Sequence, residues 1–397
     1  MKNNSAGSAG ASAAVFFLLG AAMYFGVSAS ESFNLLPKHF SLQGISPVRT
    51  GFIMGWTGAG ALLVLPFLAA VVDRFRAGRI LAVAMLVGMA VPALYFLPVP
   101  DSAFFAIPRA VQGALFAVMT ISYNAALGRV LPAGSRARGI ALFGLIGQAG
   151  GLTAAAVGEI MFDSGGLTRL YIFSFCLFAL ALISALLYPA RPPVEKNSRS
   201  SWREFIEVLG HRHYILPLFW VFTLGAGFGT FVAFLPDLVL ARGIGLVRPF
   251  YIAYPIMVAL LRLSVSQLFD RYKLVYVLAI PLAVLPLSLL SAYLAGGYTL
   301  LALAGAGYGV AHGVIFPRIM GYLMDCSPER FRGRMSLAFN MMFSLGLFVS
   351  ANLGGFVAEK SVSGVFLAMA GFTSLGFFLL LFFGSSVKDH AGQHQSS

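Results

Sequence analysis

Four ionisable side chains lie inside long apolar stretches of the sequence: Glu31, Arg109, Arg262 and His312. A charge inside an apolar span is costly, so each is a candidate for a functional role. A carboxyl group can carry a proton, a guanidinium group keeps its charge, and an imidazole titrates near neutral pH. This set predicts chemistry that moves protons or binds charge within a membrane.

Structural roles for these residues also stay open. Glu31 could form a purely structural ion pair or lie exposed above the membrane, and a lone helical histidine such as His312 is more often a packing residue. Arg262 lies eight residues before Asp270, which favours a structural role in a charge network at the inner end of its span. Glu159 and Asp237 lie near outer helix ends, and we expect both to be solvated.

Other chemistries are not indicated. The six histidines are scattered, no pair of carboxylates lies in a soluble segment, and no Gly-x-x-x-x-Gly-Lys-Ser/Thr loop is present to bind ATP. We therefore expect no enzyme, no cofactor and no metal site. Cys176 lies in an apolar run and Cys326 in a charged loop, which indicates no disulfide framework.

The composition is that of a membrane protein. Hydrophobic residues make up 59% of 397 positions, charged residues only 10%, and the mean hydropathy is +0.86. A soluble domain needs about 25% charged residues to cover its surface. The net charge of +13 could suggest nucleic acid, but the cations lie in short loops and form no basic domain. We expect no nucleic-acid partner.

Apolar runs of about 20 residues, the length that spans a bilayer, occur twelve times. They fall at roughly 13–36, 48–72, 79–98, 103–128, 138–161, 168–189, 214–239, 248–269, 274–294, 297–321, 334–357 and 363–384. The first run could instead be a signal peptide with a cleavage site near Ser28-Ala29-Ser30, but its apolar pattern continues to about Pro37, which favours a span.

The orientation follows from the basic residues. With the N-terminus inside, the inner segments carry 19 Lys and Arg residues and the outer segments 6. Both termini are then predicted to be cytoplasmic. Short loops and the lack of a disulfide framework are typical of a bacterial cytoplasmic (inner) membrane protein.

The chain divides at one long polar stretch. We predict an N-terminal bundle of six helices over 1–190, a cytoplasmic linker over 191–213, and a C-terminal bundle with a short tail over 214–397. In the linker Trp202, Phe205, Ile206 and Leu209 recur at helical spacing and predict an interfacial helix.

The two halves repeat. Asp73-Arg74 recurs as Asp270-Arg271 after 197 residues, Gln112-Gly113 corresponds to Tyr308-Gly309 after 196, and Arg136-x-Arg138-Gly139 corresponds to Arg330-x-Arg332-Gly333 after 194. Near-equal offsets in chain order indicate two homologous halves.

Twelve spans in two halves with an Asp-Arg loop after the second span resemble the major facilitator superfamily over about residues 12–385. Arg109-x-x-Gln112-Gly113 is similar to the fourth-span motif of its proton-coupled efflux branches. Arg262 and the later motifs Gly307-Tyr308-Gly309 and Phe316-Pro317 resemble bacterial drug and sugar efflux permeases. One departure is Gln148-Ala149-Gly150-Gly151, where such exporters carry Gly-Pro, and it leaves the direction of transport open.

The resemblance implies an all-α membrane fold: twelve transmembrane helices in two pseudo-symmetric six-helix bundles, with a substrate site near the bilayer midplane. In the family the first and fourth spans adjoin, and Glu31 and Arg109 lie at matching depths. We therefore hypothesise a Glu31–Arg109 pair that protonation of Glu31 breaks, with His312 as a further titratable group.

Uncharged polar and aromatic residues at mid-depth suit an amphipathic substrate. The candidates for the cavity are Tyr24, Gln148, Trp220, Thr223, Tyr254, Tyr308, Asn340 and Ser344. The candidates for gating are Asp73, Arg74, Arg262, Asp270, Arg271 and Arg332.

The function expected is proton-coupled antiport that exports a small organic compound, carried out by a monomer whose partners are its substrate, protons and the lipid bilayer. Two alternatives stay open: a symporter or facilitator that imports a sugar or organic acid, and a membrane receptor that uses a transporter fold without transporting.

Overall fold

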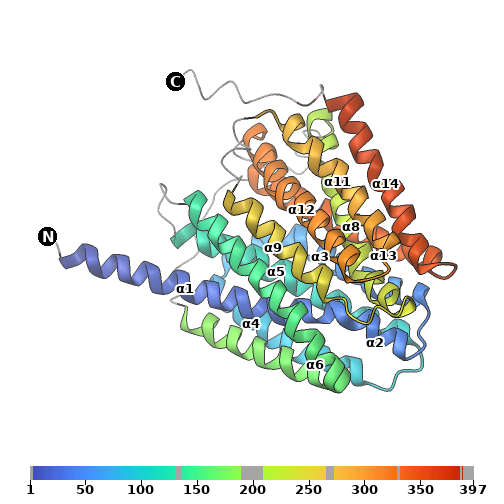
Figure 1. Cartoon of the computed structure of the whole chain (residues 1–397). Helices are drawn as coiled ribbons and strands as arrows, with labels where there is room; N and C mark the ends of the chain where they lie inside the picture. Colours follow the sequence, from blue (N-terminus) through green and yellow to red (C-terminus); the bar gives the residue numbers. More distant parts are fainter. Residues whose placement is uncertain are drawn as a thin grey trace. The chain divides into compact units, whose positions relative to one another are not determined.

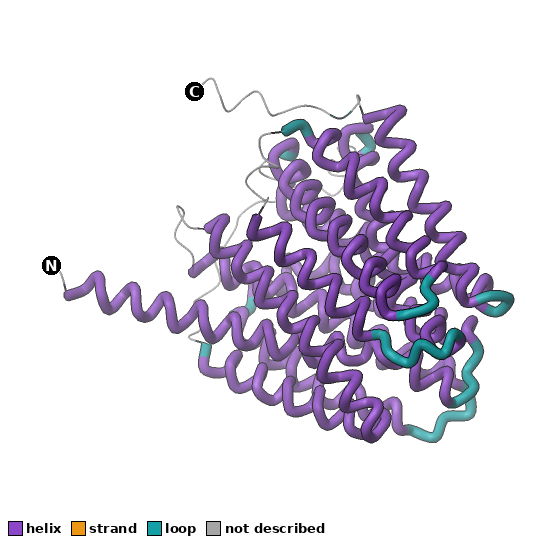
Figure 2. Tube along the Cα trace, in the orientation of Figure 1, coloured by secondary structure: helices purple, strands orange, loops and turns teal. Residues whose placement is uncertain are grey.

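The structure is a computed structural model, and it describes residues 3–130, 136–188, 209–264, 272–328, 331–384 and 387. Throughout these ranges the regular structure is helical, with no strand (Figure 2). The longer helices, labelled in Figure 1, are α1 (Asn3–Glu31), α3 (Pro47–Arg74), α4 (Ala77–Ala90), α5 (Ala106–Val130), α6 (Arg136–Leu187), α8 (Arg212–Ala241), α9 (Arg248–Ser264), α11 (Leu274–Leu294), α12 (Tyr298–Cys326), α13 (Arg332–Ala358) and α14 (Val362–Phe383).

Shorter elements extend or connect the long helices. The 3-10 helix η1 (Ser32–Leu35) and α2 (Leu36–Leu42) continue α1, and η2 (Val91–Phe96) continues α4. The 3-10 helix η3 (Ser102–Phe105) leads into α5. Its N-cap Asp101 accepts a hydrogen bond from the Ala103 amide at 2.9 Å, which satisfies one of the free donors at a helix start.

Ten segments of the described chain are long and apolar enough to cross a membrane. One of them, Leu142–Leu187, contains a break in α6, because Gly165 and Gly166 leave helical geometry. Gly166 has φ 61° and ψ −153°, a conformation open almost only to glycine. The segment therefore holds two spans. With α9, whose 17 residues fall just short, these elements correspond to the twelve predicted spans and confirm an all-α membrane protein.

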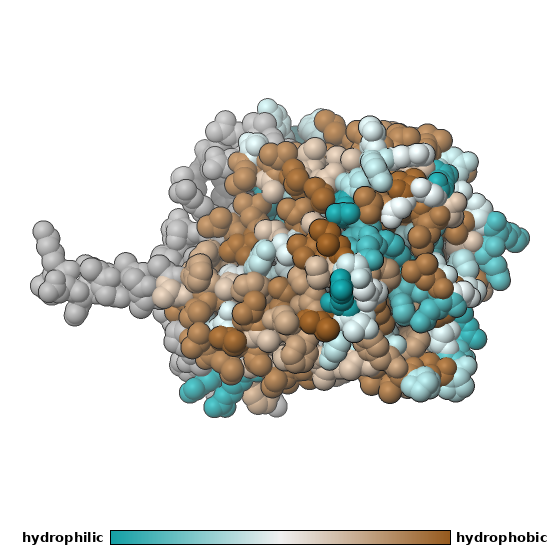
Figure 3. Space-filling view, turned by 60° about the horizontal axis from the view of Figure 1, so that its bottom comes forward, coloured by the Kyte–Doolittle hydropathy of each residue, from teal (hydrophilic) through white to brown (hydrophobic). Residues whose placement is uncertain are grey.

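The surface is apolar where lipid is expected. Large hydrophobic side chains such as Phe17, Leu63, Ile280 and Phe382 are more than 60% exposed. Hydrophobic residues cover much of the face drawn in Figure 3. Exposed apolar area on this scale is unfavourable in water and indicates a lipid-facing surface.

The chain forms two compact units. Unit 1 comprises residues 1–35 and 63–196, and unit 2 comprises residues 36–62 and 197–397. Residues 36–62 join unit 2 because α2 packs on α8 and because glycines of α3, among them Gly51 and Gly58, approach the backbone of α13 closely. The bundles expected over 1–190 and 214–397 stay a prediction.

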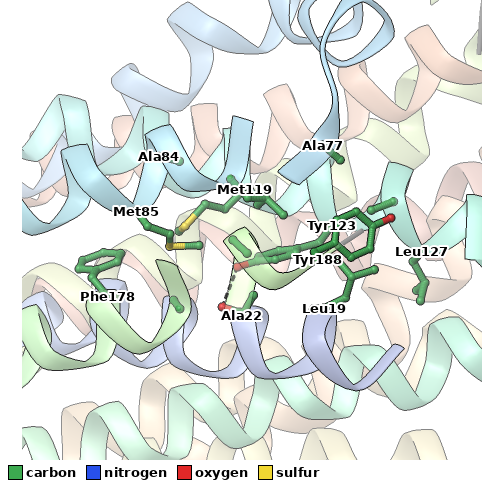
Figure 4. Packing of buried hydrophobic residues seen from close by; sticks show 14 of the residues in the cluster. Leu19, Ala22, Ala77, Ala84, Met85, Met119, Tyr123, Leu127, Phe178 and Tyr188 are labelled. Atoms are coloured by element: carbon green, nitrogen blue, oxygen red, sulfur yellow. Dashed lines mark hydrogen bonds between the residues drawn. The ribbon is translucent and has the colours of Figure 1, made fainter. Parts of the chain in front are cut away.

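In unit 1, α1 lies along the first half of α6 (Figure 1). Small residues permit this close packing, since a Cβ atom on Gly150 would collide with the Tyr24 carbonyl oxygen of α1. Beside the contact between α1 and α6 lies a buried core, drawn in Figure 4, in which Met85, Met119 and Phe178 pack together. In the same core the Tyr123 hydroxyl donates to the Ala22 carbonyl at 2.7 Å.

In unit 2, α8 packs on α13 and α9 packs on α12. Glycines line both contacts: Gly225 and Gly346 lie between α8 and α13, and Gly305 and Gly309 lie between α12 and α9. The close approach brings the aromatic side chains of four helices into one cluster, which is described below.

Candidate functional site

The buried guanidinium group of Arg109 is the centre of the polar chemistry in unit 1. Arg109 lies in the first turn of α5 and is 2% exposed. Its Nη1 donates to Oε1 of Gln112 at 3.1 Å, and its Nη2 donates to Oδ1 of Asn34 in η1 at 3.0 Å. The Tyr95 hydroxyl donates to the same Gln112 oxygen at 3.0 Å. Two hydrogen bonds of this cation thus run to neutral amide oxygens.

Glu31 is the last residue of α1, and its carboxyl group faces the backbone of Gly151 in α6. A Cβ atom at Gly151 would meet Oε2 of Glu31 at 2.5 Å, so only glycine leaves room for the carboxyl group. One turn earlier on α1, the Ser28 hydroxyl donates to the Gly150 carbonyl at 3.0 Å. The packing of α1 on α6 therefore fixes where Glu31 lies.

The predicted Glu31–Arg109 pair has a structural link through Asn34. Asn34 follows Glu31 by three residues across the junction of α1 and η1, a spacing that places both on one side of the helix. Asn34 holds Arg109, whereas Glu31 lies against Gly151. The direct pair itself stays a prediction, for a state in which the carboxyl group is charged.

In unit 2, His312 of α12 forms the corresponding polar feature. Its Nδ1 lies 2.5 Å from the hydroxyl oxygen of Tyr254 on α9. The two rings are parallel to within 12°, and Phe343 of α13 stacks on the imidazole at 6.0 Å and 26°. The structure thus brings the predicted residues Tyr254 and His312 together.

The other cavity candidates differ in exposure. Trp220, Thr223 and Tyr308 are fully buried, and each donates to a backbone carbonyl: Trp220 to Gly376 at 2.9 Å, Thr223 to Trp220 at 2.8 Å and Tyr308 to Leu224 at 3.1 Å. These bonds are packing contacts between and within helices. A direct role of these three residues in substrate binding stays a prediction.

The remaining four candidates are half-buried. Tyr24 shares a hydrogen bond with Thr153 at 2.7 Å, and Asn340 donates to the Ser336 carbonyl of its own helix at 2.7 Å. Gln148 and Ser344 are half-buried on α6 and α13. The structure does not bring these residues into one site within a single unit.

The gating candidates are placed only in part. Asp73 and Arg74 end α3, and Arg262 lies in the last turn of α9. Arg332 opens α13, is exposed, and donates from Nε to the Met324 carbonyl at 3.2 Å. Asp270, Arg271 and the linker residues Trp202, Phe205 and Ile206 lie outside the described residues.

Two carboxylates overturn a prediction. We expected Glu159 and Asp237 to be solvated, but Glu159 is 0% exposed in α6 and Asp237 is 6% exposed in α8. Asp237 accepts a hydrogen bond from the Ser41 hydroxyl of α2 at 2.5 Å. The expectation was wrong because proximity to a helix end does not reveal whether a neighbouring element, here α2, covers that end.

Sequence reasoning also missed Asn34, Tyr95 and Ser41. Each is a common neutral residue near a helix end, and only the fold brings it to a charged group. A weak signal existed for Asn34: it follows Glu31 by one turn in an otherwise apolar segment.

A family model matches the sequence along most of its length. The model of the Major Facilitator Superfamily matches residues 10–351 and, in a second overlapping match, residues 250–396. The chain therefore belongs to the major facilitator superfamily, a family of membrane transporters and not of enzymes. A search of curated protein sequences finds no significant match.

Solved structures with the same fold are distant in sequence. A mutant form of the nucleoside transporter NupG superposes with a TM-score of 0.80 at 16% identity and covers 94% of this chain and 100% of its own. A POT family transporter in complex with a thioalcohol-conjugated peptide gives 0.76 at 14% identity, with 94% and 96% covered. A bacterial homologue of the human lysosomal transporter Spinster gives 0.75 at 12%, with 96% and 99% covered. The protein is thus a multi-pass secondary transporter of a small molecule.

Proposed function

We propose that this transporter is a proton-coupled antiporter, in which Glu31 carries the proton and Arg109 senses its charge state. The observation that carries the proposal is the arrangement of Arg109, which is 2% exposed and bonded to the amide oxygens of Asn34 and Gln112. A buried cation is costly, so its position depends on the groups that hydrogen-bond to it or neutralise it. A mobile negative charge on Glu31 would change which arrangement of this group is stable.

The described arrangement is the one expected for a neutral Glu31. A protonated carboxyl group needs no cation and can lie against the Gly151 backbone, while amide oxygens hold Arg109. When Glu31 releases its proton, the carboxylate attracts Arg109 away from Asn34, which pulls on the junction between α1 and η1. Proton release and a change in helix packing are coupled in this way.

The proposal also states what is moved and where: the transporter exports a small organic compound across a bacterial inner membrane. It acts as a monomer, and both of its termini are cytoplasmic. Import by symport or facilitated diffusion is the second candidate. The sequence Gln148-Ala149-Gly150-Gly151 favours it, because the α1–α6 contact is made by glycines and lacks the proline of typical exporters. Because nucleoside and peptide transporters share the fold, nucleosides and peptides are both included in the first substrate screen.

The test is a flux assay in proteoliposomes with an internal pH dye and pooled drugs, nucleosides and peptides. For the antiporter, substrate moving one way drives protons the other way. Glu31→Gln mimics the protonated state and is expected to retain substrate exchange without a pH gradient, but to lose gradient-driven flux. Glu359→Gln, at an exposed carboxylate at the end of α13, is the matched control.

Each result has a distinct meaning. Gradient-driven flux that persists in Glu31→Gln would remove Glu31 from the coupling. Proton movement in the same direction as substrate would establish symport instead, and flux indifferent to pH would establish a facilitator.

A further inference from the structure

Unit 2 contains a continuous aromatic surface formed by Phe228 of α8, Tyr254 of α9, His312 and Phe316 of α12, and Phe343 of α13; we call it the aromatic wall. Its ring centroids lie 5.1–6.1 Å from their neighbours: His312–Phe316 at 5.1 Å, Tyr254–His312 at 5.6 Å, His312–Phe343 at 6.0 Å, Phe316–Phe343 at 6.0 Å and Phe228–Phe343 at 6.1 Å.

The wall is built by the packing of its helices. Gly309 and Gly313 of α12 allow α9 to approach until Tyr254 reaches His312. Gly225 and Gly346 do the same for α8 and α13, which brings Phe228 to Phe343. Five rings on four helices therefore meet without a flexible loop.

The rings are not sealed in the core. Phe228, His312, Phe316 and Phe343 are only half-buried, whereas the neighbouring Tyr308 and Phe250 are fully buried. Ring surface thus stays accessible along the wall. Accessible aromatic surface offers stacking to a planar partner, which adds to plain apolar burial.

One polar atom is available beside this surface. Nδ1 of His312 is engaged by the Tyr254 hydroxyl, and no hydrogen bond within the described part of the chain involves Nε2. With the tyrosine hydroxyl as donor to Nδ1, the imidazole carries its hydrogen on Nε2 and can donate it. The ring is held in place by Phe343 and Tyr254, so the direction of this donor is fixed.

We propose that the aromatic wall is the substrate-selective part of the transporter, and that it selects planar conjugated rings bearing a hydrogen-bond acceptor, which stack on Phe343 and Phe228 and accept from Nε2 of His312. This inference rests on the proposed function as a small-molecule transporter.

The test is ligand-observed NMR on the full chain in nanodiscs, with pairs of neutral probes that differ only in the ring. Benzamide is compared with cyclohexanecarboxamide, and uracil with 5,6-dihydrouracil. Stacking contributes about 0.5–1.5 kcal/mol, so the planar member of each pair should bind about 2- to 10-fold more tightly. Phe343→Leu keeps the volume but removes a ring, and should reduce this ratio to nearly one.

Two further variants separate the parts of the proposal. His312→Phe keeps a ring but removes Nε2, and should preserve the ring preference while weakening binding of both amides. Phe378→Leu, at a ring of α14 that is 50% exposed, should change nothing.

Equal binding within both pairs, no binding at millimolar concentration, or a ring preference that survives both Phe343→Leu and Phe228→Leu would overturn the proposal. The assay uses no proton gradient. Failure here with normal Glu31-dependent flux would reject the wall alone, whereas ring-selective binding without any gradient-driven flux would reject the coupling alone.

Discussion

The two units differ in the chemistry they bury. In unit 1 the guanidinium group of Arg109 binds two amides, and the carboxyl group of Glu31 lies one helical turn before one of them, Asn34. In unit 2 the corresponding region is filled by rings, with the imidazole of His312 as the polar group. The contrast is sharpest at matched positions of the internal repeat: Gln112 binds Arg109, while Tyr308 donates to the Leu224 carbonyl.

If both proposals above hold, the two units divide the tasks of proton coupling and substrate selection between them. A charged network responds to protons, but it is a poor surface for an apolar substrate because each bare charge must be solvated. A surface of rings has the opposite properties. Separate units allow each chemistry to keep its own environment.

The largest effect expected is that of Arg109→Leu. It removes two hydrogen bonds to a charged donor, each of which contributes about 1.5–3 kcal/mol, and leaves the half-buried Asn34 and Gln112 amides without that donor. Gradient-driven flux should fall at least about tenfold in the proteoliposome assay. Arg169→Leu, at an exposed arginine of α6, is the control. Normal proton-coupled flux in Arg109→Leu would mean that the charged group of unit 1 has no part in coupling.

A smaller effect is expected for Gly151→Ala. Its Cβ atom would collide with the carboxyl group of Glu31, and overpacking of this kind costs about 1–3 kcal/mol. Thermal unfolding in detergent should detect the loss, together with a severalfold fall in gradient-driven flux. Gly321→Ala in α12, where nothing lies within 4 Å, should cost nothing.

The double variant Gly151→Ala/Glu31→Ala sharpens this test. Removing the glutamate side chain removes the collision, so the two changes should be strongly non-additive in stability. Additive losses would show that Gly151 does not position Glu31.

The smallest effect is expected for Asp237→Asn. Asp237 is a buried carboxylate of unit 2, and it accepts a hydrogen bond from the Ser41 hydroxyl. Asparagine keeps an oxygen that accepts from Ser41 but removes the charge, so stability should change by less than about 1 kcal/mol. Flux in the pH-dye assay should stay nearly normal. If Asp237→Asn instead abolishes gradient-driven flux and Glu31→Gln does not, proton coupling belongs to unit 2 and the comparison is reversed.

Much of the fold was predictable because apolar runs of bilayer length leave few alternatives to membrane-spanning helices. The motif Arg109-x-x-Gln112-Gly113 also contains two residues that the structure joins, since Arg109 donates to Gln112. Which face of an apolar helix is covered was not predictable, since a helix that is hydrophobic all round carries no amphipathic signal. Trp220 illustrates this: its sequence context suggests a cavity, but its ring nitrogen binds the Gly376 carbonyl of α14.

The partners of charged groups were equally hidden. Asn34 reaches Arg109 from 75 residues away, and Ser41 reaches Asp237 from 196 residues away. Contacts between residues so far apart in the sequence cannot be predicted from local residue spacing, because they depend on how the helices pack.

The break at Gly165 and Gly166 has a mechanical consequence. Two residues are a short tether, so the facing ends of the two helical segments of α6 stay close to each other. Both segments also contact α1: Gly150 and Gly151 pack on it from the first, and the Ser174 hydroxyl of the second donates to the Ala29 carbonyl at 3.0 Å. A displacement of α1 would therefore act on both segments at once, without having to pass through the break.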